Sequence, residues 1–289
     1  MAGKRRSVVI TGASSGIGRA AAEALIAEGF HVFGSVRTQE DAEALRRALG
    51  SSVTPLLFDV TSREGIADAV TTVREAIGST TLSGLVNNAG VAVPGPLMHL
   101  DLDELRGQFE INVIGLLAVT QAFLPLLGAS RNPPGAPGRI VNISSMSGRM
   151  VVPFLGAYAA SKHAVEAMSD ALRCELMVYG IDVLLIEPGS IKTSIWDKAE
   201  AADLSPYDGT DYADILKRFR ANAVQAGRNS LETSHVTGPI VEALTSDKPR
   251  TRYPLPNNVW MGWRIPRLMP DRWADRMVTQ RLGLRRFRR

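Results

Sequence analysis

Residues 8–21, VVITGASSGIGRAA, join a short β-branched run to an alanine-rich segment through a glycine-rich loop. Gly12, Gly16 and Gly18 allow the backbone to turn tightly and to approach a ligand closely. Where such a loop opens a helix, the unpaired N–H groups of the first turn bind anions, including the pyrophosphate of a dinucleotide. The spacing is G-x-x-x-G-x-G rather than G-x-G-x-x-G, and glycine-rich turns also have structural uses. The place of the loop, between the first predicted strand and helix, favours dinucleotide binding.

Short β-branched runs and longer helical patterns alternate from Ser7 to about Glu187. Strands are predicted over residues 7–11, 31–36, 53–60, 82–90, 139–144 and 181–189, and helices over 18–28, 40–49, 101–127 and 156–179, with a further helix ending at residue 78. Asp101 is the expected N-cap of the long helix, and Glu104 completes a pattern like a capping box. Continuous apolar strands separated by helices are typical of a parallel sheet covered on both faces. We therefore predict an α/β fold with a single doubly wound parallel sheet.

The alternation ends after Glu187. Residues 194–228 have an uneven helical pattern, another helix is expected to begin near Ser234, and a stretch with Pro and Trp residues follows Lys248. No internal repeat or low-complexity linker divides the chain. We therefore predict one domain over residues 1–255, with a basic helical or loop extension of the same domain over residues 256–289.

Composition indicates an ordinary globular protein of 289 residues, with 45% hydrophobic and 21% charged residues. The single cysteine, Cys174, excludes an internal disulfide, fits a reducing compartment and is interpreted as a small packing residue. The apolar run Val8–Ile10 is too short for a signal peptide, and no stretch approaches the roughly 18 apolar residues of a membrane span. A cytoplasmic protein is expected.

The formal charge of +4 comes from the C-terminal tail. The last nine residues, RLGLRRFRR, contain five arginines, and without them the charge would be −1. A basic tail can contact nucleic acid or anionic lipid, although a solvated charge run is the commoner case. Because no nucleic-acid motif accompanies the tail, no nucleic-acid partner is predicted. The four histidines have no metal-ligand spacing and no cysteine cluster, so no metal site is predicted.

Residues 156–163, GAYAASKH, place Tyr158 and Lys162 four positions apart on one face of a predicted helix. An ammonium beside a phenol favours the ionised phenol, so we expect Lys162 to lower the Tyr158 pKa from its usual value near 10. A phenol tuned in this way can act as a general acid or base. An ordinary surface pair is the alternative interpretation.

Four short segments together resemble the short-chain dehydrogenase/reductase family. TGASSGIG at 11–18 is similar to the cofactor loop of that family, NNAG at 87–90 to its motif after the fourth strand, YAASK at 158–162 to its active-site Tyr-x-x-x-Lys, and PGSIKT at 188–193 to its nicotinamide-side motif. The resemblance covers roughly residues 7–193 in the correct order and spacing. It implies a Rossmann-like fold and an NAD(P)-dependent oxidoreductase acting on CH–OH groups.

The resemblance also implies a catalytic set of Asn112, Ser145, Tyr158 and Lys162. Tyr158 would exchange a proton with the substrate oxygen, and Ser145 would hold and polarise that oxygen, with Ser144 or Ser147 as alternatives. Lys162 would lower the Tyr158 pKa and hydrogen-bond the nicotinamide ribose. Asn112 would support a water-linked proton path to Lys162, although such a residue inside an apolar helix could equally make a packing hydrogen bond.

The cofactor residues implied by the same resemblance lie in five segments. They are Gly12, Ser14, Ser15, Gly16, Ile17 and Gly18; Arg37; Asp59 and Val60; Asn88, Ala89 and Gly90; and Tyr158 and Lys162 with Pro188, Gly189, Ile191 and Thr193. Val36 stands where the family usually carries an acid for the ribose of NAD, and Arg37 follows it. A guanidinium suits a 2′-phosphate, so NADP(H) is favoured over NAD(H), with a plain surface arginine as the alternative. A basic residue often seen in the family loop is absent, because Ser14 and Ser15 occupy those places.

The substrate is expected to be a lipophilic secondary alcohol or ketone, or an aldehyde. The apolar residues proposed to surround the reacting oxygen are Met146, Met150, Val151, Val152, Phe154, Leu155, Leu97, Met98, Ile195 and Trp196. The segment IEPGSIKTSIWDKA at 186–199 resembles family members that act on retinoids or hydroxysteroids. Residues 190–233 would form the lid over the substrate.

The resemblance further suggests a homodimer or homotetramer, formed through the helices of Asn112 and Tyr158. Residues 259–284 interleave Trp260, Trp263 and Trp273 with arginines, so they could lie on a membrane surface or pack on the domain or a second subunit. Two other functions remain open: a non-catalytic dinucleotide-binding sensor or scaffold, and a peripheral membrane protein whose main role lies in the basic tail.

Overall fold

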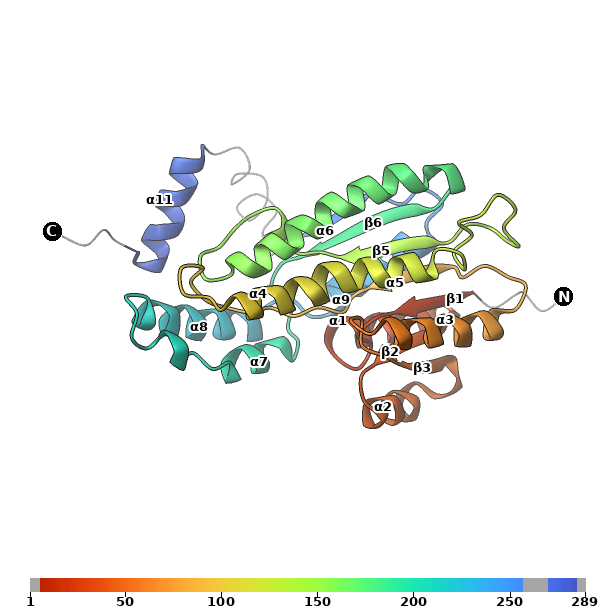
Figure 1. Cartoon of the computed structure of the whole chain (residues 1–289), viewed down its shortest axis with the longest axis horizontal. Helices are drawn as coiled ribbons and strands as arrows, with labels where there is room; N and C mark the ends of the chain where they lie inside the picture. The colour runs from red at the N-terminus through yellow and green to blue at the C-terminus, as the bar shows by residue number, and fades with distance from the viewer. Residues whose placement is uncertain (1–5, 257–269, 285–289) are drawn as a thin grey trace.

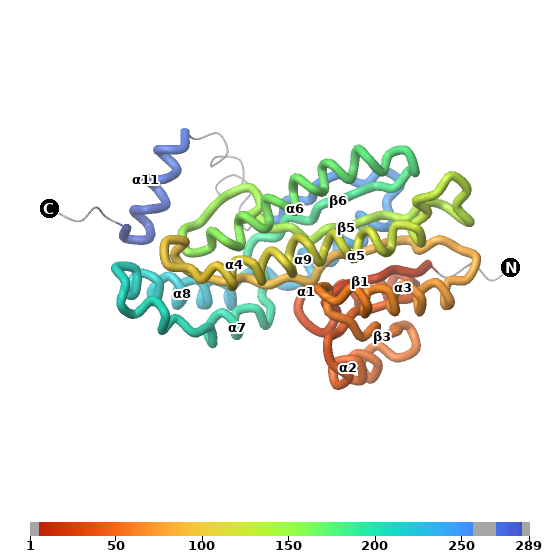
Figure 2. Tube along the Cα trace, in the orientation of Figure 1, coloured from red at the N-terminus to blue at the C-terminus, as the bar shows by residue number. Residues whose placement is uncertain are grey.

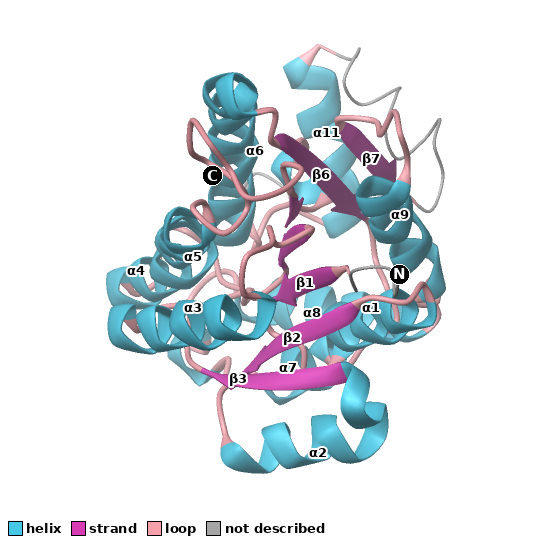
Figure 3. Ribbon diagram, turned by 90° about the vertical axis from the view of Figure 1, so that its right-hand side faces the viewer, coloured by secondary structure: helices cyan, strands magenta, loops and turns pink. Residues whose placement is uncertain are grey.

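The protein folds around a seven-stranded sheet, which runs in Figure 3 from β3 at the bottom to β7 at the upper right. The structure is a computed structural model that describes residues 6–256 and 270–284. The strand order is β3-β2-β1-β4-β5-β6-β7, and every neighbouring pair is parallel. The strands are β1 Ser7–Ile10, β2 His31–Val36, β3 Val53–Leu57, β4 Gly84–Asn87, β5 Arg139–Ile143, β6 Asp182–Pro188 and β7 Arg252–Leu255. The predicted doubly wound parallel sheet is confirmed.

Helices cover both faces of the sheet (Figures 1 and 3). The helices are α1 Gly16–Ala27, α2 Gln39–Leu49, α3 Arg63–Ile77, α4 Leu102–Phe109, α5 Leu116–Phe123, α6 Gly156–Glu175, α7 Ile195–Ala201, α8 Ala213–Arg228, α9 Ser234–Thr245 and α11 Asp271–Leu282. Single 3₁₀ turns occupy Gly50–Ser52, Met146–Gly148, Leu176–Tyr179 and Ser205–Tyr207. One buried cluster joins α1, α2 and α9 to the sheet, and a second joins α3 and α5 to its other face.

The strand order reverses between β1 and β4, because the chain runs outward from β1 through β2 to β3 and then returns to the other side of β1 as β4. In open α/β sheets the ligand binds outside the carboxyl ends of the strands at this point. The glycine-rich loop follows β1 and the NNAG segment follows β4, so the sheet brings both motifs to this crevice.

The edge strand β7 was missed by sequence reasoning. Its four residues, Arg252–Leu255, include Pro254, which cannot donate a ladder hydrogen bond and is confined to edge strands. The strand pairs with β6 at Leu185–Pro188, and Tyr253 is buried in the core. Its place in the sheet depends on this pairing rather than on any local pattern.

The predicted long helix over residues 101–127 is interrupted. A π-helical segment, Glu110–Gly115, separates α4 from α5, and such insertions are frequent at functional sites. Asp101 is the N-cap as predicted, but its carboxylate accepts from the Asp103 N–H and no capping box with Glu104 forms.

The interpretation of Cys174 as a packing residue is wrong, because its side chain is exposed on α6.

The uneven segment after β6 folds into α7 and α8. Figures 1 and 2 show these helices and α11 at the end of the molecule where α4 and α6 begin. Leu282 and Leu284, at the end of α11, pack on a cluster of buried residues from the segment 204–216 and the loop before α6: Phe154, Leu204, Tyr207 and Leu216. Trp260 and Trp263 lie outside the described residues. Within the described ranges, no helix has the length and apolar character required to span a bilayer.

Candidate active site

The glycine-rich loop is held against the segment that follows β4. The Thr11 hydroxyl accepts hydrogen bonds from the Asn88 and Ala89 N–H groups, each at 2.9 Å. In return, the Asn88 side-chain amide donates to the carbonyl oxygens of Thr11 at 2.9 Å and Gly12 at 3.1 Å. These bonds fix the loop shape before any ligand binds.

Two glycines in this loop have specific structural requirements. Gly12 has a φ of 68°, in the left-handed region that disfavours side chains. A Cβ on Gly18 would lie 2.2 Å from the Gly12 carbonyl oxygen and 2.4 Å from Asn88 Nδ2. The loop is therefore folded back on the first turn of α1, which leaves that helix N-terminus open to an anion. Ser14 and Ser15 are exposed beside it, and Ile17 packs partly on the core. The site fits the pyrophosphate of a dinucleotide.

Arg37 follows the last residue of β2 and is exposed. Within the described part of the chain it takes part in no hydrogen bond or ion pair that would occupy its guanidinium. Ser35, buried in β2, fixes the neighbouring backbone: its hydroxyl accepts from the Gly12 N–H at 2.9 Å, and its carbonyl accepts from the Ala13 N–H at 2.8 Å. Arg37 thus stands beside the glycine-rich loop.

Asp59 and Val60 follow β3. Asp59 Oδ1 accepts from the Thr61 N–H at 2.9 Å and from the Thr61 hydroxyl at 2.7 Å, so part of this carboxylate shapes its own turn. Val60 is buried and would contact a Cβ on Gly115.

The segment after β6 crosses toward the glycine-rich loop. The Gly189 N–H donates to the Leu255 carbonyl at 3.0 Å, and Ile191 is buried and bridges to Leu231. The methyl-bearing side chain of Thr193 lies 3.5 Å from the Cβ position of Gly16. The structure therefore brings the PGSIKT segment and the glycine-rich loop together, as one extended dinucleotide would require.

Tyr158 and Ser145 meet at the carboxyl end of β5, where their side chains share a hydrogen bond. Ser145 Oγ also accepts from the Ser147 N–H at 3.0 Å and lies 3.5 Å from the Pro188 carbonyl oxygen. Ser144 is buried beneath the loop, and its hydroxyl has no hydrogen-bond partner among the described residues. Of the three serines considered, Ser145 is the one that contacts Tyr158.

The expected lowering of the Tyr158 pKa is not observed. Burial raises the pKa of the phenol above its usual 10.0, and the hydrogen bond with Ser145 only partly opposes this. Burial also lowers the pKa of Lys162 from 10.5 to about 8, against the attraction of Glu166. The Lys162 ammonium lies 5.8 Å from the Tyr158 ring centroid and donates to the Ile143 carbonyl at 2.8 Å. Desolvation therefore outweighs the attraction that the four-residue spacing suggested, and the phenol is protonated at neutral pH.

Asn112 lies in the π-helical segment, almost fully buried. Its side chain accepts from the Val91 N–H at 2.8 Å and donates to the Val91 carbonyl at 2.9 Å and to Ser161 Oγ at 3.0 Å. The Cβ position of Gly90 is 3.1 Å from Asn112 Oδ1 and 3.8 Å from Lys162 Nζ, so these groups share one small space. The packing role considered for Asn112 is present, and the amide also borders Lys162.

Several residues that organise the site carried no signal in sequence. Thr11 and Ser35 hold the glycine-rich loop, and Ser161 joins Asn112 to α6 by donating to the Tyr158 carbonyl at 2.7 Å. The motif positions could have indicated Thr11, which directly precedes Gly12. Ser35 and Ser161 act through contacts between elements far apart in sequence.

The ten residues proposed to line the substrate site differ in exposure, and five of them are half-buried: Met146, Met150, Val152, Leu155 and Trp196. Leu97, Met98, Val151 and Ile195 are exposed at this end of the molecule. Phe154 is buried instead, with edge or tilted contacts to Tyr212, the N-cap of α8, and to Phe219 of α8. Its φ of 70° is rare for a bulky residue, and its carbonyl accepts from the Gly95 N–H at 2.8 Å. Phe154 therefore anchors the loop before α6 to α8 rather than lining an open wall.

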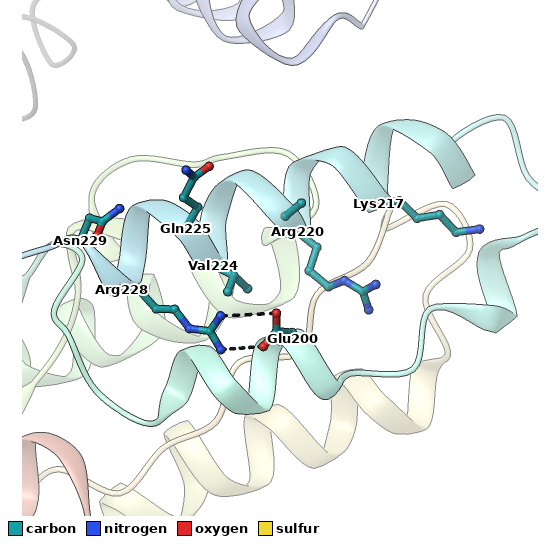
Figure 4. A pocket seen from close by; sticks show the side chains of 8 residues that line it. Glu200, Lys217, Arg220, Val224, Gln225, Arg228 and Asn229 are labelled. Carbon is teal, nitrogen blue, oxygen red and sulfur yellow. Dashed lines mark hydrogen bonds and ion pairs between the residues drawn. The ribbon is translucent and has the colours of Figure 1, made fainter.

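A pocket between α7 and α8, shown in Figure 4, contains none of the predicted catalytic residues. Most of its charged groups are already paired: Arg228 contacts Glu200 and also Asp197, and Lys217 contacts Asp208. Across residues 6–256 and 270–284, no group of three or more His, Cys, Asp or Glu side chains could hold a metal ion.

Comparisons with known proteins agree with this geometry. A family model described as short chain dehydrogenase matches residues 6–204. NADPH-dependent 3-dehydrocapnine reductase of Ornithobacterium rhinotracheale is 43% identical over 277 residues, which cover 96% of this chain and 97% of that protein. Retinol dehydrogenase 7 of Rattus norvegicus is 36% identical, over 85% of this chain and 79% of that protein. A short chain dehydrogenase/reductase from Burkholderia phymatum, solved in complex with NAD, superposes with a TM-score of 0.74 at 25% identity, over 89% of this chain and 90% of that one.

Proposed function

The chain belongs to the short-chain dehydrogenase family and is an NAD(P)-dependent oxidoreductase acting on CH–OH groups, and from this premise we propose that it reduces a lipophilic ketone or aldehyde with NADPH. The observation that carries the proposal is the meeting of Ser145 and Tyr158 beside Lys162, at the sheet edge that also holds the glycine-rich loop. The reverse oxidation of the corresponding alcohol uses the same residues.

Tyr158 is the proposed proton donor. A dinucleotide held by the glycine-rich loop and the segment 188–193 would supply the hydride. As the carbonyl carbon gains hydride, its oxygen becomes basic and takes the Tyr158 proton. Ser145 donates a hydrogen bond to the same oxygen and stabilises the charge that develops there. A phenol that stays protonated at neutral pH suits this direction, because reduction consumes a proton.

Lys162 and Asn112 restore the Tyr158 proton in this proposal. The Lys162 ammonium, with a pKa of about 8, is charged at neutral pH and stabilises the phenolate left after proton transfer. Asn112 holds the Gly90–Val91 backbone beside that ammonium. Water entering at this place could then pass a proton to Lys162 and Tyr158.

Preference for NADP(H) over NAD(H) rests on Arg37. Its exposed guanidinium beside the glycine-rich loop, with no carboxylate at Val36, suits the 2′-phosphate of NADP(H). The NADPH dependence named for the Ornithobacterium rhinotracheale relative supports this assignment.

A lipophilic substrate is supported by the exposed Leu97, Met98 and Val151, with exposed fractions of 63%, 77% and 58%. The reductase and retinol dehydrogenase activities named for the two relatives are consistent with a carbonyl or alcohol of this kind. In this proposal the lid, residues 190–233, covers the substrate and Phe154 fixes its position.

We also propose a cytoplasmic homodimer or homotetramer that can touch a membrane surface. Exposed apolar side chains at Ile114 and at Met177 and Val178, which follow α6, support self-association. Helix α11 exposes Trp273 between Arg272 and Arg276, which supports contact with anionic lipid. The free, exposed Cys174 fits a reducing compartment. Light scattering of the purified protein and co-sedimentation with phosphatidylserine vesicles test the two parts separately.

The experiment that tests the proposed function follows nicotinamide absorbance in purified protein. NADPH and NADH are compared over a panel of long-chain methyl ketones, aldehydes and steroid ketones. Turnover with NADPH on apolar substrates is expected. If the protein binds NADPH but reduces nothing in the panel, the dinucleotide-sensor interpretation replaces this one, and turnover with NADH alone would overturn only the role of Arg37.

A further inference from the structure

A group of charged side chains with two buried carboxylates at its centre lies next to the catalytic residues, and the proposed reaction does not use it. Arg149 and Arg252 contact three carboxylates, those of Glu166, Asp170 and Glu187. Glu187 is completely buried and the Glu166 side chain is 6% exposed. Burying carboxylates is costly unless cations and hydrogen bonds compensate them, and the two arginines supply the cations here.

Three members of this group adjoin different parts of the active site. Arg149 is four residues after Ser145, in the loop that carries the serine. Glu166 is one helical turn after Lys162 on the same face of α6. Glu187 directly precedes Pro188, whose carbonyl oxygen lies 3.5 Å from Ser145 Oγ.

Arg149 is the residue that connects these three parts. Its Nη2 lies 3.2 Å from Glu166 Oε2, and its Nε lies 3.7 Å from Glu187 Oε1. The chain between Ser145 and Arg149 is a single 3₁₀ turn, Met146–Gly148, capped by the Ser145 hydroxyl itself. The position of Arg149 therefore constrains Ser145 through only one short turn.

The same turn packs tightly on α6. A Cβ on Gly148 would lie 3.0 Å from Glu166 Cγ, 3.1 Å from the Lys162 carbonyl oxygen and 2.8 Å from Ser144 Oγ. The serine loop and the lysine helix are thus in direct backbone contact at the point where Arg149 ties them together.

We propose that Arg149 is a positioning residue for Ser145, held by Glu166 of α6 and Glu187 of β6. This inference rests on the proposed roles of Ser145 and Tyr158. Arg252 supplies the second cation: Nη1 contacts Glu166 and lies 3.1 Å from Glu187 Oε1, and Nη2 lies 2.5 Å from Asp170 Oδ1. It compensates the carboxylates from the β7 side, which leaves Arg149 free to orient the serine loop.

A guanidinium suits this role better than an ammonium does. Two nitrogen atoms of Arg149 face carboxylates from two different elements, which a single Lys ammonium at the end of a flexible chain does not reproduce. Burial, together with the neighbouring Glu166, also raises the pKa of Glu187, so this carboxylate needs a nearby cation to remain charged.

The test compares Arg149→Gln with Arg149→Lys in the full-length protein, with Arg47→Gln as a matched control. Arg47 forms an exposed ion pair with Glu43 on α2. With NADPH and a long-chain methyl ketone, Arg149→Gln is expected to lower kcat about 10- to 100-fold, because misplacing a reacting group by about 1 Å costs rates of that order. The KM for NADPH should change less than about twofold. Arg149→Lys should recover part of kcat, and Arg47→Gln should match the wild type.

Two further measurements separate positioning from general damage to the fold. If Arg149 acts through Ser145, adding Arg149→Gln to a Ser145→Ala variant should lower kcat by less than about threefold. Amide hydrogen exchange of residues 144–150, which needs no substrate, should be faster in Arg149→Gln and unchanged in α1.

The results that overturn the inference are equally specific. Unchanged hydrogen exchange at residues 144–150 in Arg149→Gln, an unchanged kcat, or a full additional loss in the Ser145→Ala background would each contradict it. A Tyr158→Phe variant that reduces the ketone within a few-fold of the wild-type rate would instead overturn the proposed function, whatever Arg149 does. A normal kcat in Arg149→Gln with no activity in Tyr158→Phe would remove only the positioning role.

Discussion

Replacing Lys162 with methionine is expected to stabilise the folded protein while removing its activity. The buried ammonium is 6% exposed, and its pKa is lowered from 10.5 to about 8. At 1.36 kcal/mol for each pKa unit, the folded state is destabilised by about 3 kcal/mol when this group is charged. Methionine fills a similar volume without charge. It also loses the 2.8 Å hydrogen bond to the Ile143 carbonyl, which costs about 1 kcal/mol, so a net gain of about 2 kcal/mol is expected at pH 7.

The pH dependence gives this prediction a definite sign. Between about pH 8 and 10.5 the unfolded wild-type chain binds more protons at Lys162 than the folded one, so wild-type stability rises with pH across this window. The variant lacks this titration. Its advantage over the wild type should therefore shrink above pH 8 and reverse near pH 10.5.

The assay is urea unfolding of the cofactor-free proteins at equal concentration, followed by tryptophan fluorescence at pH 7 and pH 10. Cofactor is omitted because binding to the folded state would stabilise the wild type selectively. A Lys162→Met variant that is less stable at pH 7, or a stability difference that is the same at both pH values, would refute the reasoning. Either result would mean that Lys162 is not held charged at a cost to the fold.

Three substitutions test other parts of the site. Arg37→Ala should raise the KM for NADPH about 10- to 100-fold and leave the KM for NADH unchanged, as expected for a lost charged hydrogen bond of about 1.5–3 kcal/mol. Equal effects on the two KM values would contradict the proposed contact between Arg37 and the 2′-phosphate. Gly18→Ala should abolish NADPH binding in a fluorescence titration, because its Cβ would lie 2.2 Å from the Gly12 carbonyl oxygen; unchanged affinity would show that the loop can relax. Ser145→Ala should lower kcat about 10²- to 10³-fold while Ser147→Ala has little effect; the opposite order would move the role to Ser147.

The sequence predicted the parts of the fold that depend on local pattern. The strands β1 to β6 follow continuous apolar runs, and the glycine-rich loop follows the backbone requirements of Gly12 and Gly18. Strand β7 could not be predicted in this way, because its four residues form a strand only by pairing with β6. The π-helical segment that separates α4 from α5 likewise has no sequence signal comparable to a proline.

The electrostatics of the site were the least predictable part. A spacing of four residues between Tyr158 and Lys162 suggests a lowered phenol pKa, but burial of both groups reverses that result. Arg252 contacts Glu166 and Glu187 across separations of 86 and 65 residues, through the strand that sequence reasoning missed. Desolvation and long-range pairing both depend on the folded packing rather than on any motif.

The central claim is that Tyr158 transfers the proton in a reaction organised by Ser145 and Lys162. The most direct measurement is the NADPH-dependent reduction rate of Tyr158→Phe, at saturating cofactor, on the best ketone of the panel. Removing the phenol hydroxyl should lower kcat by at least about 10²-fold while NADPH binding is retained, because general acid catalysis contributes about 10²–10⁴-fold. A Tyr158→Phe variant that reduces the ketone within a few-fold of the wild-type rate would contradict the account.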